Sequence, residues 1–286
     1  IARCVREAGL EMESLTLEPL ASSESVLTKE EKEAGVAIVD IGGGTTDIAI
    51  FKDNIIRHTC VIPYGGGIIT DDIKEGCSII EKHAEQLKVK FGSAVPELEK
   101  DSTFVTIPGL HGRPDKEISL KTLAQVVNAR VEEILEMVNT ELKAYGAFEQ
   151  KKKLIAGIVL TGGGSNLRHL RQLANYTTGF DSRIGFANEY VANDKNQHLK
   201  GPEYATSIGL LMESLKIRDK KNGNEPAEEI IEKEEVKVET NTIVIETPEF
   251  RTEEQPVNDP TERRRNKLTI GQKIMESVKK FFEEVE

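Results

Sequence analysis

Residues 36–51 have the sequence VAIVDIGGGTTDIAIF, in which two apolar, β-branched segments flank three glycines. Such segments favour β-strands, and consecutive glycines between them favour a tight turn. A second turn, Asp53-Asn54, precedes a third segment, residues 55–62, in which inward and outward residues roughly alternate. The pattern therefore predicts a three-stranded antiparallel meander.

The first glycine turn has the composition of a phosphate site. Glycines let the backbone approach a bulky anion and direct several N–H groups at it. Asp40 ends the first strand, where one carboxylate can hold the water shell of Mg²⁺. An ordinary glycine hairpin beside a surface aspartate is the alternative, but the whole run between two apolar strands favours phosphate binding. The predicted phosphate residues are Gly42, Gly43, Gly44, Thr45 and Thr46.

A second glycine turn, Thr161-Gly162-Gly163-Gly164, follows an apolar segment at 154–160 that predicts a buried strand. Ser165 is predicted to cap the helix that follows. A helix start of this kind can bind an anion or ligand, although taken alone it is equally often a packing turn. The run is neither a Walker A loop nor a strong dinucleotide fingerprint.

The segment between the two glycine turns predicts a mixture of helix and strand. Helical periodicity covers 78–91, a short strand is expected at 103–107, and Ser119 is expected to cap a long helix with one broad apolar face. A last helix is predicted from Pro202 to about Ile217, because proline favours the first helical turn.

Composition excludes several classes of protein. Lysine and arginine number 38 against 49 acidic residues, a net charge of −11, which argues against a general nucleic-acid binder. No apolar run approaches the roughly 18 residues that a membrane-spanning helix needs. The three cysteines show no CxxC spacing, which favours a reducing cytoplasm over a disulfide framework or zinc site. Because Ile1 already lies in a helical pattern, we interpret the chain as the C-terminal part of a longer protein.

Residues 218–261 are predicted to form a disordered acidic linker. From Asp219 to Thr261 there are 13 acidic and 5 basic residues, a net charge of −8, without a useful helix or strand pattern. Its apolar island, Ile243-Val244-Ile245, is either a short docking motif or, more simply, an incidental apolar patch.

The last residues, 262–286, predict an amphipathic helix lying in a membrane interface. At 100° per residue its apolar side chains share one face, while lysines and other polar side chains lie opposite. Docking of this helix on another protein is the alternative. The predicted membrane residues are Ile270, Ile274, Val278, Phe281 and Phe282 on the apolar face, with Lys273, Lys279 and Lys280 on the basic flank.

Taken together, the two glycine turns resemble the second phosphate motif and the adenosine motif of the actin-like ATPases. Within that superfamily, residues 18–23, 39–50, 61–64 and 204–211 are similar to the FtsA family of bacterial cell-division proteins. The resemblance covers about residues 1–217, and the C-terminal helix is an additional shared feature. It implies an α/β fold, the actin-like (ribonuclease H-like) second lobe with a small α/β subdomain.

The resemblance also implies a division of the chain. The expected parts are a nucleotide-binding subdomain at 1–67 and 146–217, a small subdomain at 68–145, the linker at 218–261 and the membrane-targeting helix at 262–286. The first phosphate loop of such proteins belongs to a lobe that precedes this one.

The implied ligands are ATP and Mg²⁺. Residues 42–46 would meet the β- and γ-phosphates, Glu85 would accept the ribose hydroxyls, and Lys88 would lie along the base. Without the resemblance, Glu85 and Lys88 are more simply a solvated ion pair on one helix face. The remaining adenosine residues implied are Gly162, Gly163, Gly164 and Asn166.

The implied role is an adaptor that polymerises with itself, links filaments of the tubulin-like protein FtsZ to the cytoplasmic face of the inner membrane at the septum, and helps assemble the division machinery. ATP would act mainly as a conformational ligand with at most weak turnover. A sugar- or acetate-kinase-like enzyme is the alternative. Candidate contacts for the FtsZ tail, each of which could instead be a solvated helix face, are Arg113, Lys116, Lys121 and Arg130.

Overall fold

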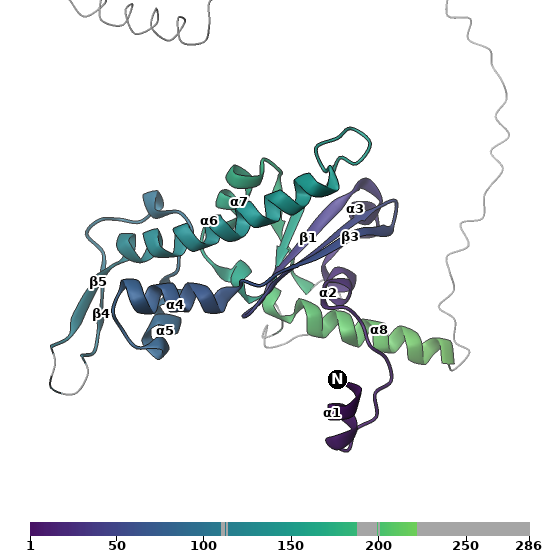
Figure 1. Cartoon of the computed structure of the whole chain (residues 1–286), viewed down its shortest axis with the longest axis horizontal. Coiled ribbons are helices and arrows are strands. Elements are labelled where there is room, and N and C mark those ends of the chain that lie inside the picture. Colours follow the sequence, from purple (N-terminus) through teal and green to yellow (C-terminus); the bar gives the residue numbers. More distant parts are fainter. Residues whose placement is uncertain (110–111, 113, 188–198, 200, 222–286) are drawn as a thin grey trace, which may run out of the picture. The chain divides into compact units, whose positions relative to one another are not determined.

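The computed structural model describes residues 1–109, 112, 114–187, 199 and 201–221 (Figure 1). They all belong to one of the two units of the chain, Ile1–Glu229. The predicted linker begins at 218, but residues 218–221 are helical and belong to α8 (Ala205–Lys221). The rest of the linker (222–261), the C-terminal helix at 262–286 and Arg113 lie outside the described residues. Their predicted roles therefore stay predictions.

A five-stranded mixed sheet with the strand order β3-β2-β1-β6-β7 organises the described residues. β1 (Val36–Ile41), β2 (Thr46–Lys52) and β3 (Ile55–Ile62) pair antiparallel, which confirms the predicted meander. β6 (Ile158–Thr161) and β7 (Ser182–Ile184) continue the sheet in parallel from β1.

β6 is shorter than the segment 154–160 predicted, because Gly157 interrupts it. Gly157 has φ +67°, and a Cβ built on it would lie 2.1 Å from the carbonyl oxygen of Asp181. The strand therefore begins only at Ile158.

Helices cover both faces of the sheet, as Figure 1 shows for α6 on one side and α2 with α8 on the other. Side chains along β1 alternate between two cores: Val39 packs with α4, α6 and α7 residues, and Ile38 packs with α2 and α8 residues. The helices are α1 (Ala2–Glu7), α2 (Glu18–Val26), α3 (Lys29–Ala34), α4 (Gly66–Gly76), α5 (Glu81–Phe91), α6 (Leu120–Tyr145), α7 (Leu170–Thr178) and α8 (Ala205–Lys221).

α2 and α8 pack with almost no space between their backbones. A Cβ on Gly209 of α8 would lie 1.8 Å from the carbonyl oxygen of Ala21 in α2. Because only a glycine permits this approach, the two helices place Ser22 and Thr206 side by side, with their hydroxyls 2.9 Å apart.

The chain between β3 and β6 carries a second, two-stranded sheet, in which β4 (Phe104–Ile107) pairs with β5 (Lys116–Ser119). The long helix α6 has buried side chains from Leu120 to Leu142, and most of them belong to the same hydrophobic core as β1 and β2. The boundary predicted at residue 68 falls inside α4, so the division into subdomains stays a prediction.

Two helix starts differ from the sequence prediction, and a third helix starts as predicted without the expected side-chain cap. α5 begins at Glu81 and not at Ser78, whose φ is +46°. Ser119 occupies the N-cap position of α6 but makes no side-chain cap hydrogen bond. Ser165 caps no α-helix: it lies in a 3₁₀ turn (Gly163–Asn166), its hydroxyl donates to Thr161 O at 2.7 Å, and α7 starts after His169.

Candidate nucleotide site

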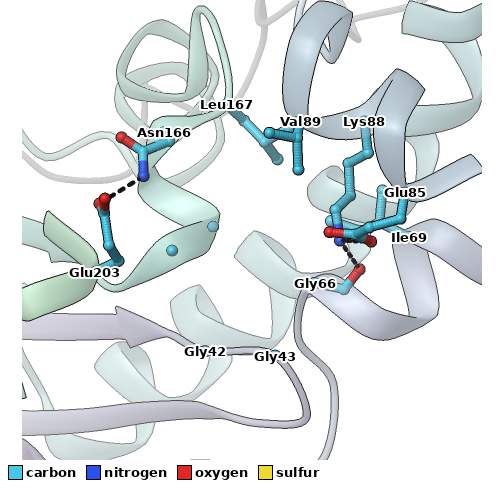
Figure 2. A pocket seen from close by; sticks show the side chains of 12 residues that line it. Gly42, Gly43, Gly66, Ile69, Glu85, Lys88, Val89, Asn166, Leu167 and Glu203 are labelled. Carbon is cyan, nitrogen blue, oxygen red and sulfur yellow. Dashed lines mark hydrogen bonds and ion pairs between the residues drawn. The ribbon is translucent and has the colours of Figure 1, made fainter. Parts of the chain in front are cut away.

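A cavity of about 320 Å³, here called the glycine cavity, lies where both glycine turns face α4 and α5 (Figure 2). The residues that line it are Gly42, Gly43, Gly66, Ile69, Glu85, Lys88, Val89, Gly163, Gly164, Asn166, Leu167 and Glu203. Seven of them were predicted: Gly42, Gly43, Glu85, Lys88, Gly163, Gly164 and Asn166. The fold therefore brings three separated parts of the predicted site together.

A third glycine run, Gly65-Gly66-Gly67, fixes the first turn in place. The backbone N–H of Gly66 donates to Gly42 O at 2.8 Å, and that of Gly67 donates to Gly43 O at 2.7 Å. A Cβ on Gly65 would lie 2.6 Å from Gly42 O, so this approach requires glycine. Sequence reasoning missed the run, although three consecutive glycines after a strand could have revealed it.

The glycines of the two predicted turns differ in how closely other atoms of the chain approach them. A Cβ on Gly43 or on Gly44 would meet no atom within 4 Å, and neither residue has positive φ. A Cβ on Gly164, in contrast, would lie 2.4 Å from Ile41 Cγ2. Packing therefore explains Gly164, whereas the chain itself leaves the space at Gly43 and Gly44 open.

The sequence predicted that the hydroxyls of Thr45 and Thr46 are available to donate to a phosphate. In the structure, both hydroxyls donate to other atoms of the protein. Thr46 is fully buried, and its hydroxyl donates to Tyr64 O at 2.8 Å. The Thr45 hydroxyl donates to Asp47 Oδ2 at 2.8 Å. Neither residue lines the glycine cavity. Their side chains therefore stabilise the turn in this structure.

Asp40 lies behind the first turn and is only 3% exposed. Its Oδ2 accepts hydrogen bonds from Ser22 at 2.6 Å and from Thr206 at 3.3 Å. Among the described residues, no group donates a hydrogen bond to the other carboxylate oxygen, Oδ1. A Cβ added to Gly162 would lie only 2.3 Å from Oδ1. Gly162, with φ +80°, therefore leaves room beside this oxygen.

Burial raises the pKa of the Asp40 carboxyl; the hydroxyl hydrogen bonds oppose this shift, and the nearby charge of Asp47 adds to it. In the described part of the chain, no three histidine, cysteine or carboxylate side chains gather to hold a metal ion. A single carboxylate with one unbound oxygen still suits Mg²⁺, which keeps most of its water and takes one or two protein carboxylates.

Glu85 and Lys88 form an ion pair of 2.7 Å on the α5 wall of the glycine cavity. The side chain of Lys88 is only 13% exposed, which a solvated surface pair would not be. Its ammonium also donates to Gly66 O at 2.7 Å and to Thr70 Oγ1 at 2.8 Å. Burial tends to raise the pKa of Glu85, but hydrogen bonds from Lys88 and Thr70 and the charge of Lys88 hold it below its usual value.

Asn166 and Glu203 lie on the opposite wall, where the Asn166 amide donates to Glu203 Oε2 at 2.8 Å (Figure 2). Sequence reasoning did not single out Glu203, because Pro202-Glu203 indicated only a helix start. The apolar side chains of Ile69, Val89 and Leu167 complete the lining. The cavity thus combines open backbone, one ion pair and apolar walls.

The family model for the cell division protein FtsA matches residues 37–209, which include both glycine turns and the helices between them. The chain belongs to the FtsA family. It is 40% identical over 215 residues to the FtsA of Pseudomonas aeruginosa, covering 75% of this chain and 50% of that protein. It is 37% identical over 229 residues to the FtsA of Neisseria meningitidis, covering 80% and 53%.

The fold is actin-like, as the sequence predicted. MreB5 of Spiroplasma citri, solved in a complex with ADP, superposes with a TM-score of 0.63 at 21% sequence identity, covering 77% of this chain and 65% of that one. The chain spans about half the length of the FtsA relatives it matches. Among the described helices of this FtsA-family chain, none is long and apolar enough to cross a membrane.

Of the cations predicted to meet an FtsZ tail, the three that the structure describes do not form one cluster in this FtsA-family chain. Arg130 donates to Asp72 of α4 through two nitrogens, at 2.6 and 3.1 Å. Lys121 pairs with Asp101 at 2.6 Å, and Lys116 donates to Cys77 O. Helical rise places Lys121 and Arg130 roughly 13 Å apart along α6. Arg130 therefore joins α6 to α4 and is not a free surface cation.

Asp40→Asn is expected to raise the melting temperature near neutral pH. Asparagine keeps an acceptor for Ser22 and removes a buried charge. Because the folded-state pKa of Asp40 is raised, the folded wild type takes up a proton more readily than the unfolded chain as pH falls. The advantage of the variant should therefore shrink between about pH 7 and pH 4, near the usual range of carboxylates.

Thermal unfolding followed by circular dichroism measures this difference. Asp181→Asn, at an exposed aspartate, is the matched control and should leave the melting temperature unchanged. A lower melting temperature for Asp40→Asn at neutral pH would show that the charge itself stabilises the fold.

Proposed function

We propose that the glycine cavity binds ATP with Mg²⁺ as one wall of a two-lobed nucleotide cleft. The open space at Gly43 and Gly44 is the observation that carries this proposal, because no packing contact explains why these positions lack side chains. The solved MreB5 neighbour holds ADP on a similar fold, which supports the same ligand class.

Each part of the cavity suits one part of the nucleotide. The backbone around Gly43 would receive the phosphates, Glu85 would accept the ribose hydroxyls, and Gly163 with Asn166 would face the nucleoside. Asp40 would hold Mg²⁺ through water, and the ion would supply positive charge to the phosphates. We assign none of these residues as a general base, so ATP serves as a conformational ligand with weak turnover.

We further propose that this chain is part of an adaptor that connects FtsZ filaments to the membrane, the role expected of the FtsA family. It would polymerise with itself, bind the C-terminal tail of FtsZ, and attach FtsZ filaments to the cytoplasmic face of the inner membrane at the septum, together with other division proteins. Membership of the FtsA family supports this role over the kinase-like enzyme that the glycine turns alone left open.

Gly43→Val should abolish ATP binding and leave the fold intact. The branched side chain would occupy the proposed phosphate space, and its Cβ would meet no protein atom within 4 Å, so we expect little change in the melting temperature. Isothermal titration calorimetry on a full-length protein that carries this sequence measures the affinity, which should fall at least about 100-fold, the cost of displacing a well-bound charged group. Unchanged affinity in a folded variant would remove the first glycine turn from the phosphate site.

The small subdomain is proposed to receive the FtsZ tail beside Lys116 and Lys121. Lys116 lines a second cavity together with Ile79, His83 and Ile107, so it combines positive charge with an apolar surface. Arg130 is excluded from the test, because charge reversal there would break its contacts with Asp72.

Lys116→Glu combined with Lys121→Glu should weaken binding of an FtsZ tail peptide by about tenfold, since each rim charge contributes about 1 kcal/mol or less. Fluorescence anisotropy measures the affinity. Lys151→Glu combined with Lys153→Glu, two exposed lysines elsewhere on the chain, changes the net charge by the same amount and is the control. Equal affinity in the double variant and the control would move the tail site to another surface.

The C-terminal helix at 262–286 is proposed to bind anionic membrane. Phe281→Glu with Phe282→Glu should release the protein from vesicles, because two carboxylates would enter the apolar interface. Adding salt should weaken wild-type binding only partially, because salt screens the basic flank alone. Co-sedimentation with vesicles that contain anionic lipid measures both effects.

Gln272→Glu with Ser277→Glu adds the same charge outside the apolar face and is the matched control. It should reduce binding much less than the phenylalanine variant. If the two double variants sediment alike, charge alone explains the loss, and the proposed apolar contact is wrong.

A further inference from the structure

Two donors converge on a single oxygen of Glu85, a residue that lines the glycine cavity. Thr70 of α4 donates its hydroxyl to Glu85 Oε2, and the Lys88 ammonium lies 2.7 Å from the same atom. Within the described residues, the other oxygen, Oε1, accepts no hydrogen bond. The carboxylate therefore has one saturated oxygen and one that is available to a ligand.

The direction of each hydrogen bond follows from the chemistry of the three groups. An ammonium can only donate, so the contact of 2.8 Å makes the Thr70 oxygen an acceptor from Lys88. The single Thr70 proton then goes either to Glu85 Oε2 or to Gly66 O, which is 3.2 Å away. Gly66 O already accepts from Lys88 at 2.7 Å, so the shorter contact with Glu85 takes the proton.

Burial makes Thr70 the fixed member of this group. Thr70 is 5% exposed, whereas the side chain of Glu85 is 49% exposed and could otherwise adopt several rotamers. Thr70 also belongs to α4, whose first turn holds Gly42 and Gly43 through the N–H groups of Gly66 and Gly67. One helix thus fixes both the first glycine turn and the carboxylate of α5.

We propose that Thr70 is a positioning residue that holds Glu85 with Oε1 free as a preset acceptor, and thereby sets the preference of the cavity for a nucleotide that carries sugar hydroxyls. This inference rests on the proposed binding of ATP. Thr70 does not touch the ligand itself, and Lys88 acts with it as the second positioning group. Glu85 is ionised and can only accept, so it favours a hydroxyl donor over the bare carbon of a deoxy sugar.

The test compares the affinities for ATP and for 2′,3′-dideoxy-ATP, which lacks both sugar hydroxyls, in a full-length protein that carries this sequence. Wild type should prefer ATP by about tenfold or more, the usual value of a hydrogen bond to a charged group. Thr70→Val has nearly the same shape without the hydroxyl and should lose most of that preference. Thr70→Ser restores the hydroxyl and should restore the preference.

A merely structural role for Thr70 would weaken both nucleotides equally and leave their affinity ratio unchanged, and this result would overturn the inference. Should Thr70→Val fail to fold, Lys88→Met removes the other donor to Oε2 and is expected to lower the same ratio. If wild type binds ATP but does not distinguish it from the dideoxy analogue, the inference fails while the proposed function stands. If wild type binds neither nucleotide, the proposed function itself fails.

Discussion

The carbonyl groups of Gly42 and Gly43 accept hydrogen bonds from the first turn of α4, and the glycine cavity depends on this contact. A helix N-terminus has backbone N–H groups without partners inside the helix, and here the β1–β2 turn supplies their acceptors. Backbone hydrogen bonds therefore fix the turn together with the side chains of Thr45 and Thr46, and the positions of Gly43 and Gly44 remain open. A ligand can approach a surface prepared in this way without first displacing a side chain.

The same helix gives the cavity its second fixed wall. Thr70 lies one turn after Gly66, and together they hold the ammonium of Lys88 between α4 and α5. Because Lys88 is mostly buried, its charge needs three acceptors, and Glu85 supplies the charged one. The backbone of the first glycine turn and the carboxylate of Glu85 thus share one support, although Gly43 and Glu85 are 42 positions apart in the sequence.

The sequence predicted β1, β2, β3, β4 and β6 and seven of the twelve cavity residues, because these depend on local patterns, but it missed the short strands β5 and β7. β-branched segments separated by the glycine turn and by the Asp53-Asn54 turn define β1, β2 and β3 independently of the rest of the chain. Side-chain partners were harder to predict, since they come from distant residues. The sequence around Thr46 does not reveal that its hydroxyl donates to Tyr64 O. Likewise, the sequence around Arg130 does not reveal that its guanidinium donates to Asp72. Gly157 shows a further limit, because the approach of Asp181 shortens β6.

Asp40 illustrates why a protein retains a residue that burial disfavours. Its carboxylate has no cationic partner among the hydrogen bonds and ion pairs of the described residues, only the hydroxyls of Ser22 and Thr206. Hydroxyls alone compensate incompletely for the lost hydration of a charge. A bound cation would supply the missing charge, so the energetic cost in the free protein becomes affinity in the complex. Since Ser22 and Thr206 belong to α2 and α8, a change in the charge of Asp40 acts directly on the contact between those two helices.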